Sequence, residues 1–214
     1  RKSPEGIYCT VQGDARRACE ANGGTTGFGE TSAARRARGC LGGIMIISHL
    51  AQLGHKDIAY VAGPQFLSTG FERYQGYLQG LAKVGLKANS DLFAEGEAFT
   101  EEAGRRAASK ILATRQRFTA IAAGNDLMAL GCYDELMAKG LKCPEDVSVV
   151  GFDDMPFAGH FNPPLTTVHT PLLDIGAEAA RILLEQIEEA DLPPRTQKLR
   201  PELIVRASTD LARG

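Results

Sequence analysis

Short apolar strands alternate with amphipathic helical stripes along the chain from residue 42 onward. The predicted strands are 58–62, 91–94, 119–123, 147–150 and 203–205. Between them, apolar residues recur at helical spacing, and Gly54, Gly85 and Gly140 provide the stops that end three of the predicted helices. Regular alternation of strand and helix is typical of an α/β fold built on a doubly wound parallel sheet.

Three of these strands end in small or polar residues. The first is followed by Gly63, another by Gly124 and Asn125, and the strand at 147–150 runs on to Asp153 and Asp154. The carboxyl ends of parallel strands share one edge of the sheet, and open α/β sheets bind ligands at that edge. We therefore expect Asn125 and Asp153 to converge on a polar small molecule.

Composition excludes several classes of partner. The chain has 214 residues, of which 43% are hydrophobic, so it can bury the core of one large domain or two small subdomains. Its net charge of -2 and the absence of a long Lys/Arg run argue against a surface for nucleic acid. No apolar run approaches the length that spans a bilayer, and no secretory signal is recognisable, so we expect a cytoplasmic protein without membrane contact.

The sequence gives no sign of a metal site, a cofactor or catalysis. Its five cysteines lack CxxC spacing, and its histidines lack the HxxxH spacing that places two ligands on one helix face. The glycines at 23–29 lack the lysine of a phosphate-binding loop, and no serine stands in a GxSxG turn. A hydrolase or isomerase that uses Asp153 and Asp154 remains an alternative without positive support.

Four segments in a fixed order resemble one known family. They are GHKDIAYVAGP at 54–64, TGFERYQG at 69–76, AAGNDLMALG at 122–131 and VSVVGFDDMPFAGHFNPPLTTVHTP at 147–171. Together they resemble the effector-binding core of LacI/GalR-type bacterial transcription regulators, over about residues 42–209. The resemblance implies a periplasmic-binding-protein-like fold, in which a small effector lies in the cleft between two α/β subdomains.

The resemblance also implies which residues bind the effector. Arg73, Asn125 and Asp153 match the family's polar clamp, Phe99 stands where an aromatic ring often stacks on the ligand, and Thr69 stands where a hydroxyl often contributes. A guanidinium, an amide and a carboxylate can bridge vicinal hydroxyls while an aromatic face covers a sugar ring. The expected effector is a sugar or a sugar derivative, bound without a metal.

Each of these residues also has a plainer interpretation. An arginine on a helix is usually exposed, so the plainer interpretation of Arg73 is a solvated helix residue. Asn125 is well placed to cap the helix that follows it. Phe99 is compatible with simple core packing, and Asp153 with a strand-end carboxylate that caps a turn. For Asp154 we expect a cap or turn role rather than ligand contact.

The same resemblance divides the chain into unequal parts. Residues 1–41 are expected to be a remnant of the first subdomain, with a Gly/Ala/Arg-rich stretch at 23–41 that we hypothesise to be frame-altered. Residues 42–168 form the predicted C-terminal effector-binding subdomain. Residues 169–192 are the predicted crossover and returning helix, and 193–214 the final strand and tail.

The function implied is effector sensing coupled allosterically to operator binding. Full-length family members begin with a helix-turn-helix domain that is not recognisable here, so operator DNA is expected to contact only an upstream domain. The resemblance further implies a homodimer. The alternative is a periplasmic sugar-binding protein of a transporter, which shares the fold.

Overall fold

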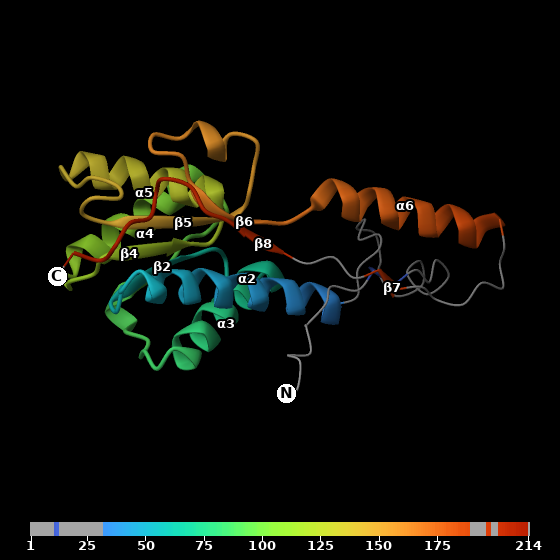
Figure 1. Cartoon of the computed structure of the whole chain (residues 1–214), viewed down its shortest axis with the longest axis horizontal. Coiled ribbons are helices and arrows are strands. Elements are labelled where there is room, and N and C mark those ends of the chain that lie inside the picture. Colours follow the sequence, from blue (N-terminus) through green and yellow to red (C-terminus); the bar gives the residue numbers. More distant parts are fainter. Residues whose placement is uncertain (1–10, 13–31, 189–195, 198–200, 214) are drawn as a thin grey trace. The chain divides into compact units, whose positions relative to one another are not determined.

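The computed structural model describes residues 11–12, 32–188, 196–197 and 201–213. The chain forms two compact units (Figure 1). The main unit comprises Gly39–Thr170 and Glu202–Gly214, and the minor unit comprises Arg1–Arg38 and Pro171–Pro201. All the residues predicted to bind an effector therefore belong to the main unit.

A six-stranded sheet forms the centre of the main unit. Its strand order is β3-β2-β4-β5-β6-β8. The strands are β2 (Ile58–Ala62), β3 (Phe93–Glu95), β4 (Ala120–Ala123), β5 (Ser148–Asp153), β6 (Thr166–His169) and β8 (Glu202–Ile204). All neighbours pair in parallel except β6 and β8. The parallel-dominated α/β fold predicted from the alternation is confirmed.

The antiparallel strand β8 departs from the all-parallel expectation. The chain leaves the main unit after Thr170 and re-enters it at Glu202. Glu202 pairs with His169, the last residue of β6, so β8 runs back along the strand from which the chain departed. Alternation of apolar residues predicts that a strand exists but does not predict its direction, which a return connection decides here.

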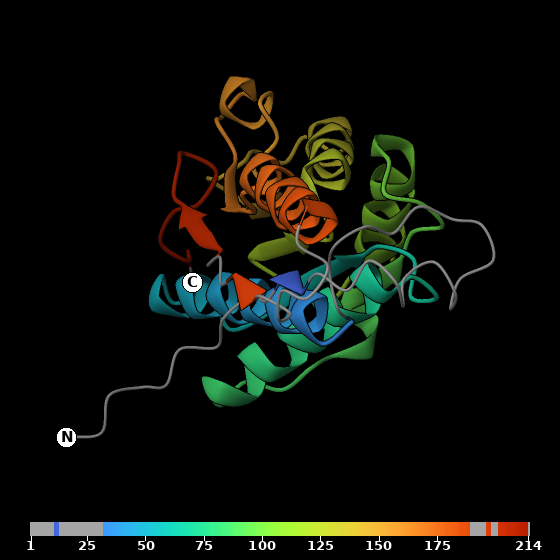
Figure 2. The same cartoon turned by 90° about the vertical axis from the view of Figure 1, so that its right-hand side faces the viewer.

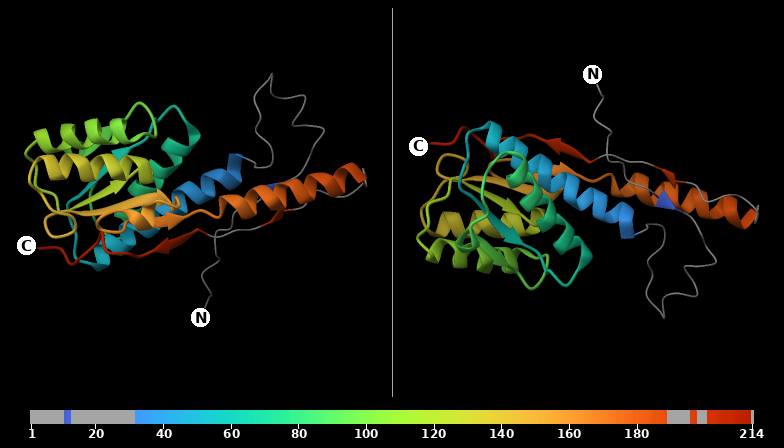
Figure 3. Two further views of the ribbon diagram at one scale, coloured as in Figure 1. Left: turned by 90° about the horizontal axis from the view of Figure 1, so that it is seen from above. Right: turned by 90° about the horizontal axis from the view of Figure 1, so that it is seen from below.

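Helices cover both faces of the sheet (Figures 1 and 3). They are α2 (Ser32–Gln52), α3 (Ser68–Lys83), α4 (Glu101–Ala113) and α5 (Asp126–Ala138). Ile47 of α2 and Leu81 of α3 pack in one apolar cluster with Tyr60, while Ile111 of α4 packs in the other with Val61. Consecutive strand residues face opposite sides, so β2 contributes to both clusters.

Helix α2 begins earlier than the sequence pattern indicates. Apolar periodicity starts near Ile46, whereas the helix begins at Ser32 and runs through the Ala/Arg-rich segment AARRARG. Alanine and arginine are strong helix formers without any apolar stripe, so a criterion based on periodicity misses this part. Residues 23–31 of the stretch that we hypothesised to be frame-altered lie outside the described residues.

The predicted helix boundaries elsewhere are largely confirmed. Gly54, Gly85 and Gly140 have φ values of 90°, 75° and 73°, which a residue with a side chain rarely adopts, and they end α2, α3 and α5. Thr100 caps α4, because its side chain accepts a hydrogen bond from the Ala103 amide. The predicted strand at 91–94 is a short 3-10 helix (Ser90–Leu92) followed by β3.

The described part of the minor unit holds the first turns of α2, the helix α6 (Leu172–Glu188) and one pair of strands, and Figure 2 shows α6 nearly end-on. Strand β1 (Val11–Gln12) pairs antiparallel with β7 (Thr196–Gln197). Of residues 1–41, which we expected to be a remnant of the first subdomain, 1–10 and 13–31 lie outside the described residues. Among the helices that the structure describes, none combines the length and apolar character needed to cross a bilayer.

Candidate functional site

Arg73 and Asp153 form a two-pronged ion pair at the carboxyl end of β5. The Arg73 Nη2 donates to Asp153 Oδ1 at 2.6 Å, and Nη1 donates to Asp153 Oδ2 at 3.1 Å. The same Nη1 donates to the Gly124 carbonyl, just beyond β4, at 2.6 Å. Arg73 thus joins the ends of two adjacent parallel strands, where open α/β sheets bind ligands.

Arg73 is buried rather than solvated. Only 9% of the residue is exposed, and its guanidinium carbon lies 4.0 Å from the centre of the Phe152 ring and 5.5 Å from that of Phe99. A carboxylate, a carbonyl and aromatic rings around a buried guanidinium offset the free-energy cost of removing its charge from water. The plainer interpretation of Arg73 as a solvated helix residue is therefore wrong.

The two adjacent aspartates at the end of β5 have different partners. Asp153 and Asp154 have φ values of 105° and 54°, in a region that residues other than glycine rarely occupy. Asp153 binds Arg73, whereas Asp154 binds Arg206 at 2.7 Å and lies 3.0 Å from His169. Our expectation of a cap or turn role for Asp154 missed these two side-chain contacts, because both partners are distant in the sequence.

Asn125 caps helix α5, as the plainer interpretation proposed. Its Oδ1 accepts a hydrogen bond from the Met128 amide at 2.9 Å. Its side-chain nitrogen makes no hydrogen bond to any residue that the structure describes, and it follows directly on Gly124, whose carbonyl binds Arg73. Capping fixes the orientation of Asn125 and leaves its N–H donors available for a ligand.

Phe99 and Thr69 lie near Arg73 in different ways. The partly buried Phe99 packs on the apolar cluster under α4 and α5, and a Cβ on Gly63 would stand 2.1 Å from its ring. Thr69 is partly buried and lies one helical turn before Arg73 on α3, so both are on the same face of the helix. The structure thus brings Arg73 into contact with both Asp153 and Phe99, whereas the side chain of Thr69 makes no hydrogen bond to the described residues.

Asp126 is the charged residue that sequence reasoning missed. It is fully buried and accepts hydrogen bonds from the Met155 amide at 2.7 Å and the Thr167 hydroxyl at 2.6 Å. Burial raises the pKa of its carboxyl to about 6, although both hydrogen bonds oppose this shift. Its position directly after Asn125 at a strand end was the available signal. Asp126 ties the start of α5 to the loop after β5 and to β6.

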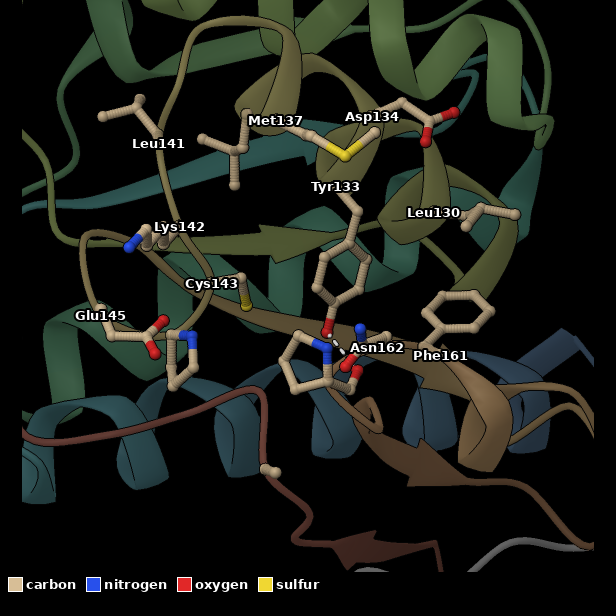
Figure 4. Close-up of a pocket in the computed structure, with 14 residues that line it drawn as sticks. Leu130, Tyr133, Asp134, Met137, Leu141, Lys142, Cys143, Glu145, Phe161 and Asn162 are labelled. Carbon is tan, nitrogen blue, oxygen red and sulfur yellow. Dashed lines mark hydrogen bonds between the residues drawn. The ribbon is translucent and has the colours of Figure 1, made fainter.

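The main unit also contains a cavity of about 580 Å³ in another place (Figure 4). The cavity is lined by Leu130, Tyr133, Asp134, Leu136, Met137, Leu141, Lys142, Cys143, Pro144, Glu145, Phe161, Asn162, Pro163 and Ala207. None of the predicted effector-binding residues lines it. Residues 141–145 precede β5 whereas Asp153 ends it, so the cavity borders the opposite end of that strand from the Arg73–Asp153 pair.

Cavity volume therefore indicates the region beside α5, whereas the buried ion pair indicates the carboxyl end of β5. The buried ion pair is the better guide to a ligand-binding site. Around the cavity, the Tyr133 hydroxyl donates to the Pro163 carbonyl at 3.1 Å, while Lys142 and Glu145 are exposed. The pair of Arg73 and Asp153, by contrast, keeps two opposite charges largely away from water at the carboxyl end of a strand. Within the described residues, no group of His, Cys, Asp or Glu is arranged to hold a metal ion.

Comparison with known proteins identifies relatives of most of the chain. The model of the periplasmic binding protein-like domain matches residues 47–209. The HTH-type transcriptional repressor PurR of Pasteurella multocida is 38% identical over 167 residues, which are 78% of this chain and 50% of that protein. The repressor CytR of Escherichia coli K12 is 37% identical over 163 residues, or 76% and 48%. The chain spans about half the length of these curated relatives.

Solved structures of transcription regulators also match most of this chain. A sugar-binding transcriptional regulator of the LacI family from Escherichia coli, complexed with phosphate, has a TM-score of 0.75 and 31% identity over 81% of this chain and 62% of that chain. The regulator CelR in complex with cellobiose has a TM-score of 0.72 and 36% identity over 81% and 52%. A dimeric lac repressor with a C-terminal deletion has a TM-score of 0.75 and 28% identity over 81% and 62%.

Proposed function

Since the chain belongs to the family of periplasmic binding protein-like domains, as the effector-binding core of a LacI/GalR-type regulator, we propose that it senses a sugar or sugar derivative. In the intact regulator this binding controls a DNA-binding domain outside the chain, in a cytoplasmic homodimer. Relatives that are named transcriptional repressors support a regulator over a transporter's binding protein or an enzyme.

The observation that carries the proposal is the Arg73–Asp153 pair. Its side chains are 10% and 18% exposed, so the pair is largely shielded but still within reach of a ligand. The guanidinium has N–H groups beyond those bound to Asp153 and Gly124, and the carboxylate oxygens accept further hydrogen bonds. Vicinal hydroxyls of a sugar accept hydrogen bonds from the Arg73 guanidinium and donate hydrogen bonds to the Asp153 carboxylate.

Three neighbours complete the proposed site. The free amide N–H groups of Asn125 offer further donors beside Gly124, and the ring of Phe99 supplies an apolar face. Thr69 adds a hydroxyl from the same face of α3 as Arg73. Such a mixture of a few fixed polar groups and an aromatic ring is suited to a polyhydroxylated ring with one apolar side.

Effector binding controls the regulator through differential affinity. A ligand shifts a conformational equilibrium only as far as it binds one conformation better than the other. The ion pair is fixed by buried contacts within the main unit, so the ligand meets a preorganised surface there. The expected position of the effector in a cleft between subdomains remains a prediction.

Calorimetry on this chain tests the proposal. The ligands are pentoses, hexoses, disaccharides and nucleobases, and the variants are Asp153→Ala and Arg73→Ala. Each variant leaves a charge without its partner, so we expect affinity for the bound sugar to fall by about 100-fold. Arg106→Ala is the matched control, because Arg106 pairs with Glu97 and Glu102 on the exposed face of α4. If both test variants bind like the parent, the site is misplaced.

A further inference from the structure

Two side chains from different parts of the sheet hold the carboxylate of Asp154. Its Oδ1 accepts a hydrogen bond from Arg206 Nη2 at 2.7 Å, and its Oδ2 lies 3.0 Å from His169 Nδ1. The Asp154 side chain is only 16% exposed. The Arg206 side chain is 24% exposed and the His169 side chain 40%, so the Arg206 contact is the better shielded of the two. Charge-assisted hydrogen bonds are stronger than neutral ones, and they weaken with exposure to water.

The partners of Asp154 stand where the chain passes between the two units. His169 ends β6, one residue before the chain leaves the main unit after Thr170. The chain re-enters at Glu202, runs through β8, and reaches Arg206 two residues beyond that strand. One carboxylate therefore binds both the outgoing segment and the returning segment.

Arg206 is itself firmly placed. Its Nη1 donates to the Leu165 carbonyl at 2.7 Å, and its backbone amide donates to the Thr166 hydroxyl at 2.9 Å. These contacts attach Arg206 to the start of β6, while His169 lies at the end of the same strand. Asp154 is thus linked directly to the end of β6 through His169 and indirectly to its start through Arg206.

Asp154 is also joined by one peptide bond to the residue that binds Arg73. Both aspartates have positive φ, a conformation that costs free energy and persists where surrounding contacts enforce it. The Arg73 contact holds Asp153, and the Arg206 and His169 contacts hold Asp154. A rotation of either residue changes the direction in which the other side chain points.

We propose that Asp154 is a positioning residue that couples Asp153 to the two segments connecting the units. The part that concerns the effector rests on the proposed function. A ligand that binds the carboxylate of Asp153 displaces this residue. The backbone shared by the two aspartates transmits the displacement to Asp154, and from there to His169 and Arg206. Asp154 does not need to touch the ligand for this role.

The test combines hydrogen exchange with sugar binding on this chain. In Asp154→Ala without ligand, we expect the amides of 168–170 and 202–206 to exchange about tenfold faster, because a charged hydrogen bond is lost. Affinity in the sugar panel, which includes ribose and cellobiose, should fall by about tenfold. Asp154→Asn keeps an oxygen that accepts from Arg206. Its amide exchange rates and its sugar affinity should therefore lie between those of Asp154→Ala and the parent.

Ser208→Ala is the matched control. It removes the hydroxyl that accepts from the Thr166 amide and donates to the Val149 carbonyl, so it weakens the attachment of the returning segment without removing a contact of Asp154, His169 or Arg206. We expect it to lower the denaturation midpoint and to leave sugar affinity within about twofold of the parent. A general loss of stability is thereby separated from a loss of positioning.

Three results overturn the proposal. They are unchanged exchange in Asp154→Ala, faster exchange in that variant with unchanged sugar affinity, and an equal loss of affinity in Ser208→Ala at equal destabilisation. If the parent binds no ligand of the panel, the proposed function fails instead. The exchange measurement then still decides whether Asp154 holds the two connecting segments.

Discussion

The Arg73–Asp153 pair and the cavity beside α5 belong to the same unit and have opposite characters. The cavity measures about 580 Å³, whereas the void that Arg73 lines inside the main unit is about 10 Å³. Met137 at the cavity is 74% exposed, whereas Arg73 is 9% exposed and contacts Gly124, Asp153 and Phe152. Converging, desolvated polar groups identify a site at a strand end better than volume does.

The largest expected effect is on stability at the ion pair. Arg73→Ala leaves the Asp153 carboxylate without its cation, and we expect the free energy of unfolding to fall by about 3 kcal/mol. Glu145→Ala removes an exposed charge at the cavity and should change it by less than about 0.5 kcal/mol. Urea unfolding followed by circular dichroism measures both. A larger loss in Glu145→Ala would reverse the comparison.

The next effect tests how tightly the aromatic side of the site is packed. A Cβ at position 63 would lie 2.1 Å from the Phe99 ring, so Gly63→Ala must displace that ring. Overpacking of this kind costs about 2 kcal/mol, and we expect sugar affinity to fall with it. Thermal unfolding and calorimetry report the two effects.

Gly159→Ala is the control for this substitution. An added Cβ at 159 meets nothing closer than Arg206 Nε at 4.0 Å, so neither stability nor binding should change appreciably. If Gly63→Ala behaves in the same way, the packing around Phe99 is looser than the structure indicates. The contrast between a tight site and an open cavity would then weaken.

A smaller effect concerns pH at Asp126. Its pKa of about 6 in the folded state lies above the ordinary value of 3.8, so the folded protein binds this proton more tightly than the unfolded chain. The stability contributed by this group therefore rises as pH falls from 7 to 5, by about 1 kcal/mol. Asp126→Asn should lack this increase when urea unfolding is compared at both pH values. An identical pH dependence in parent and variant would contradict a desolvated Asp126.

The smallest effect is expected at the cavity itself. Met137→Ser replaces an exposed lining residue and should change the free energy of unfolding by less than about 0.5 kcal/mol. Sugar affinity should remain within about twofold of the parent. If Met137→Ser abolishes binding while Asp153→Ala does not, the cavity rather than the strand-end pair is the effector site.

Much of the fold could be predicted from local patterns. Glycine stops, the cap at Thr100 and the alternation of strand and helix all depend on residues close together in sequence. The start of α2 and the direction of β8 could not be predicted in this way. The first lacks an apolar stripe, and the second depends on where the chain returns from the minor unit.

The candidate site shows the same division. The sequence pattern placed Asn125 and Asp153 at one edge of the sheet, and the family resemblance added Arg73, Phe99 and Thr69 as binding residues. The structure brings Arg73, Asp153 and Phe99 together, although their binding of an effector remains a proposal. The position of Asp126 after Asn125 was a signal in the sequence, but its burial was not predictable, because its hydrogen-bond partners Met155 and Thr167 are distant in the chain.

The sequence by itself determined the α/β class, the family, and the acidic end of β5, because these depend on periodicity and on short motifs read in order. Only the tertiary structure decided which of the two adjacent aspartates binds Arg73 and which binds Arg206 and His169. The reason is physical: both aspartates have positive φ, so the directions of their side chains depend on contacts with residues far away in the chain.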